Sequence, residues 1–252
     1  MRVSRRRFVT GCATCAVLME ASWARAEGIS AWETIKGPGF TLNYVGRMRD
    51  IIMSGKREGV MSLRQLHQAG HPYGLGPVAG LRGEVTMLDG RITVSEVNSE
   101  RHVKTAQVDD VLVPFFVWAD VDRWRSESIS MAFASMEELA AAVGAAGARH
   151  AMGDAFPFLV TGKFRSINFH IVDGRPDAPP GMEAHKKMQV PFDLSDVAAT
   201  LVGFWSNRHQ GTFTQMGSNA HVHFVTDDGN YAGHIEGLSA VGGSLNLELP
   251  AP

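Results

Sequence analysis

The chain has 252 residues, of which 44% are hydrophobic and 20% are charged, and this balance is typical of a globular protein with a substantial apolar core. Its formal net charge of −2 shows no excess of positive charge, which argues against nucleic acid as a partner. After the N-terminal segment, no apolar run approaches the roughly 20 residues that cross a bilayer, so we expect no membrane-spanning helix.

The N-terminal segment has the features of an export signal in the expected order. The twin-arginine pattern Ser4-Arg5-Arg6-Arg7-Phe8 is followed by a weakly apolar run from Val9 to Met19 and by the small residues of a cleavage site at Ala24-Arg25-Ala26. We expect residues 1–26 to be a twin-arginine signal peptide and residues 27–252 to form a domain that works in the periplasm or is secreted. The alternative is a disordered basic N-terminus.

Removal of this segment would change the chemistry of the mature chain. Both cysteines, Cys12 and Cys15, lie inside the segment, so disulfides and thiolate ligands are excluded for the mature chain. Because the segment also holds five arginines and one glutamate, its removal would lower the formal charge from −2 to −6.

Most of the remaining chain predicts β-structure, because its apolar runs are short and rich in Val, Phe and Thr. Short helices are expected over Tyr44–Ser54 and Ser62–Leu66, and an Ala-rich helix is expected from Ser135 to about His150. The dipeptide Asp89-Gly90 predicts a tight hairpin turn. The expected strands are Gly83–Leu88, Arg91–Val97, Val111–Trp118, Phe156–Phe164, Ser166–Val172 and Ala199–Trp205. The Pro-rich stretch Pro176–Pro180 predicts a loop, which could mark a soft boundary near 174–182 between two β lobes.

Histidines cluster near the C-terminus in the pattern of a β-hairpin. His221 and His223 alternate along a predicted strand, so their side chains project from one face about 7 Å apart. The turn Asp227-Asp228-Gly229-Asn230 follows, and with Asp228-Gly229 as its two loop residues the register places His223 opposite His234. The same register places His221 opposite Glu236.

Three imidazoles on one face predict a metal site, with zinc as the expected ion. Three His ligands leave a coordination position open for water or substrate, which is typical of catalytic rather than structural zinc. Manganese, iron, cobalt, nickel and copper also bind such sites. The alternative is a solvated strand face, and for Glu236 an exposed position is favoured over ligation. The remaining histidines outside these motifs are expected at the surface or in the core: His67, His71, His102, His150, His185 and His209.

Several separated motifs match those of one known family in order. They are Gly74-Leu75-Gly76, Gly83-Glu84, Leu88-Asp89-Gly90, Pro114-Phe115-Phe116, Thr200-Leu201-Val202-Gly203-Phe204-Trp205, His221-x-His223-Phe224, Asp227-Asp228 and Gly233-His234. On these residues the chain resembles the alpha-acetolactate decarboxylase family, zinc enzymes of acetoin synthesis. The resemblance implies a β-rich mixed α+β fold of the α/β type, with two packed mixed or antiparallel sheets and a few peripheral helices. It also implies a homodimer.

The resemblance implies a chemistry as well. Zinc held by His221, His223 and His234 would chelate the hydroxyl and carbonyl oxygens of a 2-hydroxy-3-oxo acid such as 2-acetolactate, and loss of CO2 would leave an enediolate that the metal stabilises. Glu84 matches a family glutamate beside the metal, which helps to deliver a proton or to order the substrate. Without the resemblance, Glu84 would be interpreted as an exposed strand carboxylate.

The chain departs from the family at its expected substrate contacts. A family arginine that contacts substrate aligns with His170, and an imidazole cannot form the bidentate contact of a guanidinium. The family also contributes a glutamate from a C-terminal tail, for which only Glu236 or Glu248 could substitute here. These departures, together with export, leave two alternatives open. One is a different lyase, isomerase or hydrolase reaction on another periplasmic substrate, with His170 as acid or base; the other is a non-catalytic periplasmic metal-binding protein.

Overall fold

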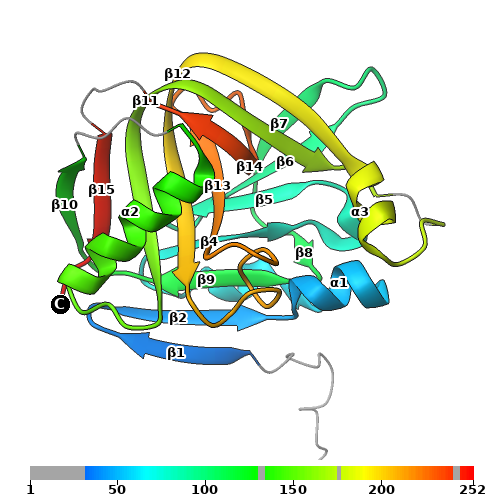
Figure 1. The fold of residues 1–252 in the computed structure, drawn as a ribbon. Helices are drawn as coiled ribbons and strands as arrows, with labels where there is room; N and C mark the ends of the chain where they lie inside the picture. Colours follow the sequence, from blue (N-terminus) through cyan, green and yellow to red (C-terminus); the bar gives the residue numbers. More distant parts are fainter. Residues whose placement is uncertain (1–31, 130–133, 175–176, 241–244) are drawn as a thin grey trace, which may run out of the picture.

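Two antiparallel sheets form the body of the computed structural model, which describes residues 32–129, 134–174, 177–240 and 245–252 (Figure 1). The predicted signal peptide lies outside these residues, and the predicted boundary near 174–182 lies partly outside them. The β-rich mixed α+β fold expected from the sequence is confirmed. No helix within the described ranges is long and apolar enough to cross a membrane.

Seven strands form the first sheet in the order β1-β2-β9-β4-β5-β6-β7. The β5–β6 hairpin turns at Asp89-Gly90 as predicted, with Leu88 paired to Arg91. The strands are β1 (Glu33–Gly37), β2 (Phe40–Val45), β4 (Pro72–Pro77), β5 (Glu84–Leu88), β6 (Arg91–Val97), β7 (Val103–Val108) and β9 (Phe116–Asp120).

Six strands form the second sheet in the order β10-β15-β11-β12-β13-β14. An additional pairing between β11 and β14 closes β11, β12, β13 and β14 into a ring of strands. This ring holds the histidine hairpin against the C-terminal half of β11. The strands are β10 (Trp124–Ile129), β11 (Ala155–Val172), β12 (Gln189–Ser206), β13 (Ala220–Thr226), β14 (Ala232–Ser239) and β15 (Leu245–Pro250).

Short elements complete the fold. Helices α1 (Met48–Ser54) and α3 (Met182–Met188) lie together at one end of the molecule, and α2 (Met136–Arg149) packs on β12 (Figure 1). The smaller elements are a two-stranded ladder of β3 (Met61–Ser62) and β8 (Leu112–Val113), and 3-10 turns at Leu63–Leu66 and Ala79–Leu81.

Helix α2 shows how the sequence determines a local element. The Ser135 side chain accepts a hydrogen bond from the Glu138 amide, as the N-cap of a capping box does, while the Glu138 carboxylate accepts one from the amide of Ala134, one residue before the N-cap. Gly144 and Gly147 do not interrupt the helix. A Cβ at Gly144 would lie 2.8 Å from the Trp205 ring and one at Gly147 would lie 2.2 Å from the Phe156 ring, so these glycines allow α2 to pack closely on β11 and β12.

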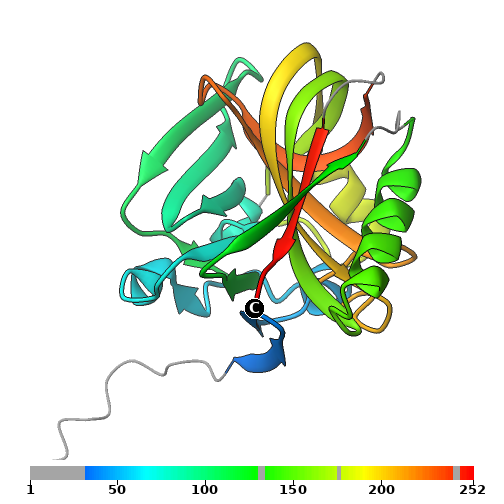
Figure 2. The ribbon, with the colours of Figure 1, turned by 90° about the vertical axis from the view of Figure 1, so that its left-hand side faces the viewer.

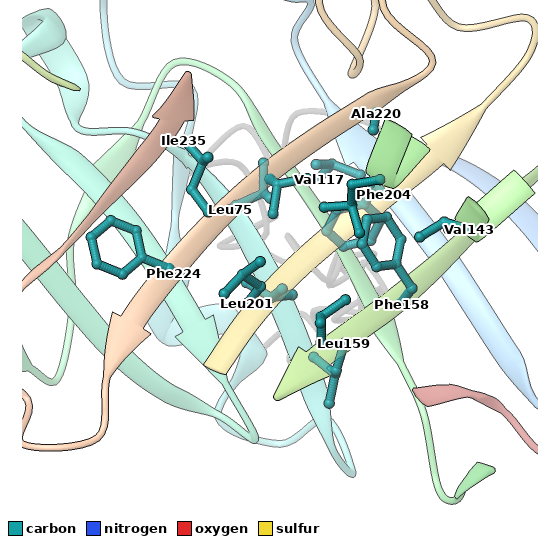
Figure 3. Packing of buried hydrophobic residues seen from close by; sticks show 14 of the residues in the cluster. Leu75, Val117, Val143, Phe158, Leu159, Leu201, Phe204, Ala220, Phe224 and Ile235 are labelled. Atoms are coloured by element: carbon teal, nitrogen blue, oxygen red, sulfur yellow. The ribbon is translucent and has the colours of Figure 1, made fainter. Parts of the chain in front are cut away.

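One continuous core joins the two sheets. Figure 3 shows Leu75 and Val117 of the first sheet among side chains of the second, including Phe158, Leu201 and Phe204. Figure 2 shows the strands of the first sheet beside the long curved strands of the second. Glu84 of the first sheet and His223 of the second meet along this contact between the sheets.

Some element predictions differ from the structure. The helix expected over Tyr44–Ser54 begins only at Met48, because Gly46 turns the chain at a φ of 68° after β2 ends. The strand expected over Val111–Trp118 divides into β8 and β9, which belong to different sheets. The two strands expected between Phe156 and Val172 are one strand, β11.

Gly83, which directly precedes Glu84, provides a test of how the fold positions that carboxylate. Its φ is 150°, and a Cβ there would lie 2.4 Å from the backbone oxygen of Ser95. We expect Gly83→Ala to lower the free energy of unfolding in urea by roughly 2–6 kcal/mol, because backbone strain and the steric clash add. Gly229→Ala is the matched control, with a φ of 71° and no atom within 4 Å of the added Cβ. It should cost about 1 kcal/mol from backbone strain alone, and an equal loss in the two variants would contradict the steric argument.

Candidate metal centre

The histidine hairpin has the predicted register. In the ladder between β13 and β14, His223 pairs with His234, as expected from a two-residue loop at Asp228-Gly229. The turn is held by the Asp228 carboxylate, which accepts hydrogen bonds from the Thr226 hydroxyl and the Asn230 amide. His221, His223 and His234 are all buried, and one ligand nitrogen of each lies within 4.8 Å of the other two.

Each imidazole is oriented by a contact to its outer nitrogen. His221 Nδ1–H donates to the Phe213 carbonyl at 2.9 Å, and His223 Nδ1 lies 3.3 Å from the Thr86 hydroxyl. His234 Nε2 contacts the Gln215 amide, whose oxygen accepts the ring proton when the amide is turned toward it. Metal-binding histidines are usually fixed through the second ring nitrogen in this way, which leaves the other nitrogen free to bind the ion.

The inner nitrogens of the three rings fit a bound cation. His221 Nε2 and His234 Nδ1 lie 3.1 Å apart, and with both outer nitrogens protonated two lone pairs face each other across this distance. His223 Nε2 is buried and has no hydrogen-bond partner within the described residues. A cation among these nitrogens would satisfy all three, and nitrogen ligands from imidazole suit zinc. The residues present therefore fit a metal ion.

Burial keeps the three rings in the form that binds metal. It lowers the pKa of His221 to about 4, and burial together with neighbouring imidazoles lowers the pKa values of His223 and His234 well below 6.5. All three rings are therefore neutral at pH 7. A metal does not have to displace a proton from them at this pH.

Glu84 reaches the histidines from the other sheet. It lies on β5, is 4% exposed, and places Oε2 at 3.7 Å from His223 Nε2 and Oε1 at 3.8 Å from His170 Nε2. Oε1 also accepts a hydrogen bond from the Val172 amide at 3.3 Å. Burial raises the pKa of Glu84 well above its usual range, so this side chain can hold a proton beside the histidines. Glu84 is not the exposed strand carboxylate of the alternative interpretation.

His170 joins the site because of a β-bulge in β14. Asn168 pairs with Gly237 but Phe169 pairs with Ile235, so Glu236 is the extra residue and His170 comes to lie opposite His234. The His170 and His234 rings stack with centroids 4.5 Å apart. Glu236 Oε1 lies 2.8 Å from His170 Nδ1, and although burial alone would raise the pKa of Glu236, this contact lowers it.

The bulge also overturns the pairing expected for Glu236. The described ladder between β13 and β14 ends at His223 and His234, before the predicted pair of His221 with Glu236. Glu236 instead lies beside His170 and its side chain is 48% exposed. Glu248, the other candidate for the missing tail glutamate, lies on β15 and is not among the residues that line the cavity at the site.

A cavity of about 240 Å³ opens onto these residues. The sequence did not indicate four polar side chains that line it, namely His185, Lys186, Gln189 and Gln215. Gln215 lies in an irregular loop after β12, and His185 lies on the short helix α3, where no spacing pattern distinguished it from a surface histidine. The polar part of the lining consists of Glu84, His170, His185, Lys186, Gln189, Gln215, His221, His234 and Glu236.

The sequence pattern of alpha-acetolactate decarboxylase matches residues 44–250, which is most of the chain. The chain belongs to the alpha-acetolactate decarboxylase family. Its similarity to individual members is distant. It is 28% identical over 97 residues to alpha-acetolactate decarboxylase of Bacillus licheniformis, covering 36% of this chain and 38% of that protein. It is 28% identical over 90 residues to the Brevibacillus brevis protein of the same name, covering 36% of this chain and 30% of the relative.

Crystal structures show that the family fold is retained. A Staphylococcus aureus protein of unknown function similar to alpha-acetolactate decarboxylase superposes with a TM-score of 0.66 at 18% identity, covering 81% of this chain and 83% of that one. Acetolactate decarboxylase from Bacillus subtilis subspecies spizizenii superposes with a TM-score of 0.65 at 19% identity, covering 83% and 85%. At these identities the superpositions establish the fold, while the reaction has to be argued from the site.

Zinc affinity tests the roles of the inner and outer nitrogens. We expect Thr86→Val, which removes only the hydroxyl near His223 Nδ1, to weaken zinc binding by about 10–100-fold. His223→Ala removes a ligand and should weaken binding further. The exposed His102 provides a control, since His102→Ala should leave zinc affinity unchanged. Calorimetric titration against a competing chelator measures these affinities, and wild-type affinity in His223→Ala would rule out this site.

The pH dependence of stability tests the burial of neutral histidines. An unfolded histidine has a pKa near 6.5, whereas His221 has a folded pKa of about 4. The unfolded chain therefore binds more protons below pH 6.5, and the stabilisation present above that pH is lost as the pH falls toward 4. Urea unfolding of the metal-free protein should show a falling free energy between about pH 6.5 and 5, because three buried histidines outweigh the opposite contribution of the one buried carboxyl group, Glu84, whose pKa is raised. The slope should be smaller in His221→Asn, and a flat profile in the wild type would contradict the burial argument.

Proposed function

We propose that this protein is a zinc-dependent decarboxylase that acts on a 2-hydroxy-3-oxo acid such as 2-acetolactate, giving acetoin and CO2. The observation that carries the proposal is the convergence, in a chain of this family, of three neutral buried histidines with a buried carboxyl group, that of Glu84, whose Oε2 lies 3.7 Å from His223 Nε2. A cavity that reaches both groups gives a small substrate access to them.

The histidine triad would hold the metal. His221 Nε2, His223 Nε2 and His234 Nδ1 are the inner nitrogens available as ligands. A zinc ion bound there supplies Lewis-acid stabilisation of negative charge on substrate oxygen atoms. The contacts of Phe213, Thr86 and Gln215 to the outer nitrogens keep the rings in place, so little reorganisation accompanies binding.

Glu84 is suited to deliver the proton that decarboxylation requires. When the bond to the carboxylate carbon breaks, its electron pair remains on the substrate, and one proton must reach the carbon that lost CO2. Burial raises the pKa of Glu84 well above its usual range, which favours the protonated form, and Glu84 lies beside His223. A general acid in such a position typically contributes 10²–10⁴-fold to the rate.

His170 and Glu236 lie beside this acid. His170 Nε2 is directed toward Glu84, while its Nδ1 is held by the Glu236 carboxylate. A carboxylate at Nδ1 fixes the orientation and tautomer of an imidazole ring. We assign His170 the hydrogen bond to a polar group of the substrate, and Glu236 the task of holding His170 in place.

A second candidate function follows from the same position. His170 lies at the position where the resemblance implies an arginine, and a single imidazole cannot form the bidentate hydrogen bonds that a guanidinium forms with a carboxylate. The same metal centre would then catalyse another lyase, isomerase or hydrolase reaction. The twin-arginine pattern at Arg5 and Arg6 would place this reaction in the periplasm, on another oxygenated substrate. A non-catalytic metal-binding protein, the third alternative, would bind the metal and convert no substrate.

Activity on acetolactate tests the leading proposal. Purified zinc-loaded protein should convert racemic 2-acetolactate to acetoin and CO2. Glu84→Gln should lower kcat by about 10²–10⁴-fold while zinc content stays unchanged, His223→Ala should lose both zinc and activity, and His102→Ala should behave as the wild type. No acetoin above the spontaneous rate would eliminate this substrate.

The same assay on cell fractions tests export. Activity of the wild type should be found in the periplasmic fraction, and activity of the variant in which Arg5 and Arg6 are both changed to Lys should be found in the cytoplasmic fraction.

A further inference from the structure

The cavity beside the histidines is also lined by apolar side chains. Five side chains form what we call the apolar rim. They come from three segments that are far apart in the chain: Met48, Ile51 and Ile52 of α1, Met182 of α3, and Met216 of the loop before β13. Met216 is 41% exposed, so the rim reaches the surface, whereas the histidines and Glu84 are buried. The cavity thus joins the buried polar groups to an apolar lining that reaches the surface at Met216.

Backbone hydrogen bonds join the segments of the rim into one unit. The amides of Met48 and Arg49 at the start of α1 donate to the carbonyls of Thr212 and Gly211, at 2.9 Å and 2.8 Å, in the loop that carries Met216. The amide of Gly181, which directly precedes α3, donates to the carbonyl of Ile52 at 2.7 Å. The rim is therefore fixed before a ligand arrives, and such preorganisation lowers the entropic cost of binding.

The polar groups of a 2-hydroxy-3-oxo acid use only the buried polar part of the lining. Its oxygens need the metal, Glu84 and His170, whereas 2-acetolactate offers nothing but methyl groups to the apolar residues. Two further lining residues on α3, His185 and Lys186, are polar. The lysine side chain is exposed at the surface, and its methylene stem can cover an apolar ligand while the ammonium group stays in water.

We propose that the apolar rim is a binding subsite for an alkyl substituent several carbons long, so that the preferred substrate is a 2-hydroxy-3-oxo acid in which such a chain replaces one methyl group of acetolactate. This inference rests on the proposed function. Three of the five rim residues are methionines, whose unbranched and polarisable side chains adapt to apolar ligands of different shape. The subsite therefore accepts a range of chain lengths rather than a single one.

A homologous series of substrates tests the subsite. Zinc-loaded protein is assayed with 2-acetolactate and with analogues that carry ethyl, propyl and butyl in place of one methyl group, and CO2 release is measured. Each methylene that is buried against the rim should raise kcat/KM roughly fourfold. Highest activity on 2-acetolactate, or a flat series, would overturn the inference and leave the proposed function standing.

Two methionine variants distinguish an effect of the apolar rim from an effect of any exposed methionine. Met216→Ser removes an exposed rim residue, so the fold should tolerate it, and the preference for butyl over methyl should fall roughly threefold or more. Met53→Ser is the matched control, because Met53 lies on α1, is 51% exposed and does not line the cavity within the described residues. It should keep the full preference, and an equal loss in both variants would contradict the assignment.

A binding measurement decides the inference if no member of the series is turned over, an outcome that would refute the proposed function. Calorimetric titration of the zinc-loaded protein with 2-hydroxy-2-methyl acids of increasing chain length should show affinity rising with each methylene in the wild type and in Met53→Ser. The rise should be weaker in Met216→Ser. Affinities independent of chain length would overturn the subsite.

Discussion

The packing of the histidine hairpin against the first sheet is the contact on which the site depends. It buries His223 completely and leaves its inner nitrogen without a hydrogen-bond partner within the described residues. A buried polar atom in this state costs about 1–3 kcal/mol, and the lone pairs of His221 and His234 that face each other add repulsion. A bound cation would relieve both, so we expect metal affinity and conformational stability to rise and fall together.

The two sheets contribute different parts of the chemistry. The second sheet provides the three imidazoles and His170, while the first sheet provides Glu84 and Thr86. The distance between Glu84 and the three histidines is therefore set by how the sheets pack, and the shared core around Leu75, Val117 and Leu201 holds that distance. Burial has a second effect, because the same exclusion of water lowers the pKa values of the histidines and raises the pKa of Glu84.

The sequence predicted best those features that depend on neighbours along the chain. The hairpin turn at Asp228-Gly229 and the alternation of His221 and His223 determine the His223–His234 register, and a capping pattern determines α2. The fold class and the family followed from motif order. Long-range features were not accessible in this way. Strand β12 extends ten residues before the predicted Ala199, because its first half is shaped by pairing with β11 rather than by its own pattern. His185 and the apolar rim come together only through the tertiary packing of α1 and α3.

The bulge at Glu236 has a consequence for how such a site can change over evolution. Side chains on a strand alternate between faces, so a shift of one residue turns every later side chain to the opposite face. The extra residue in β14 lies between the pair of Asn168 with Gly237 and the pair of Phe169 with Ile235. A deletion of the single codon for Glu236 would make the ladder regular and leave His170 opposite His234, but it would remove the carboxylate that contacts His170. A lineage could thus lose or regain this partner of His170 by one deletion or insertion and keep the hairpin of the three imidazoles in register throughout.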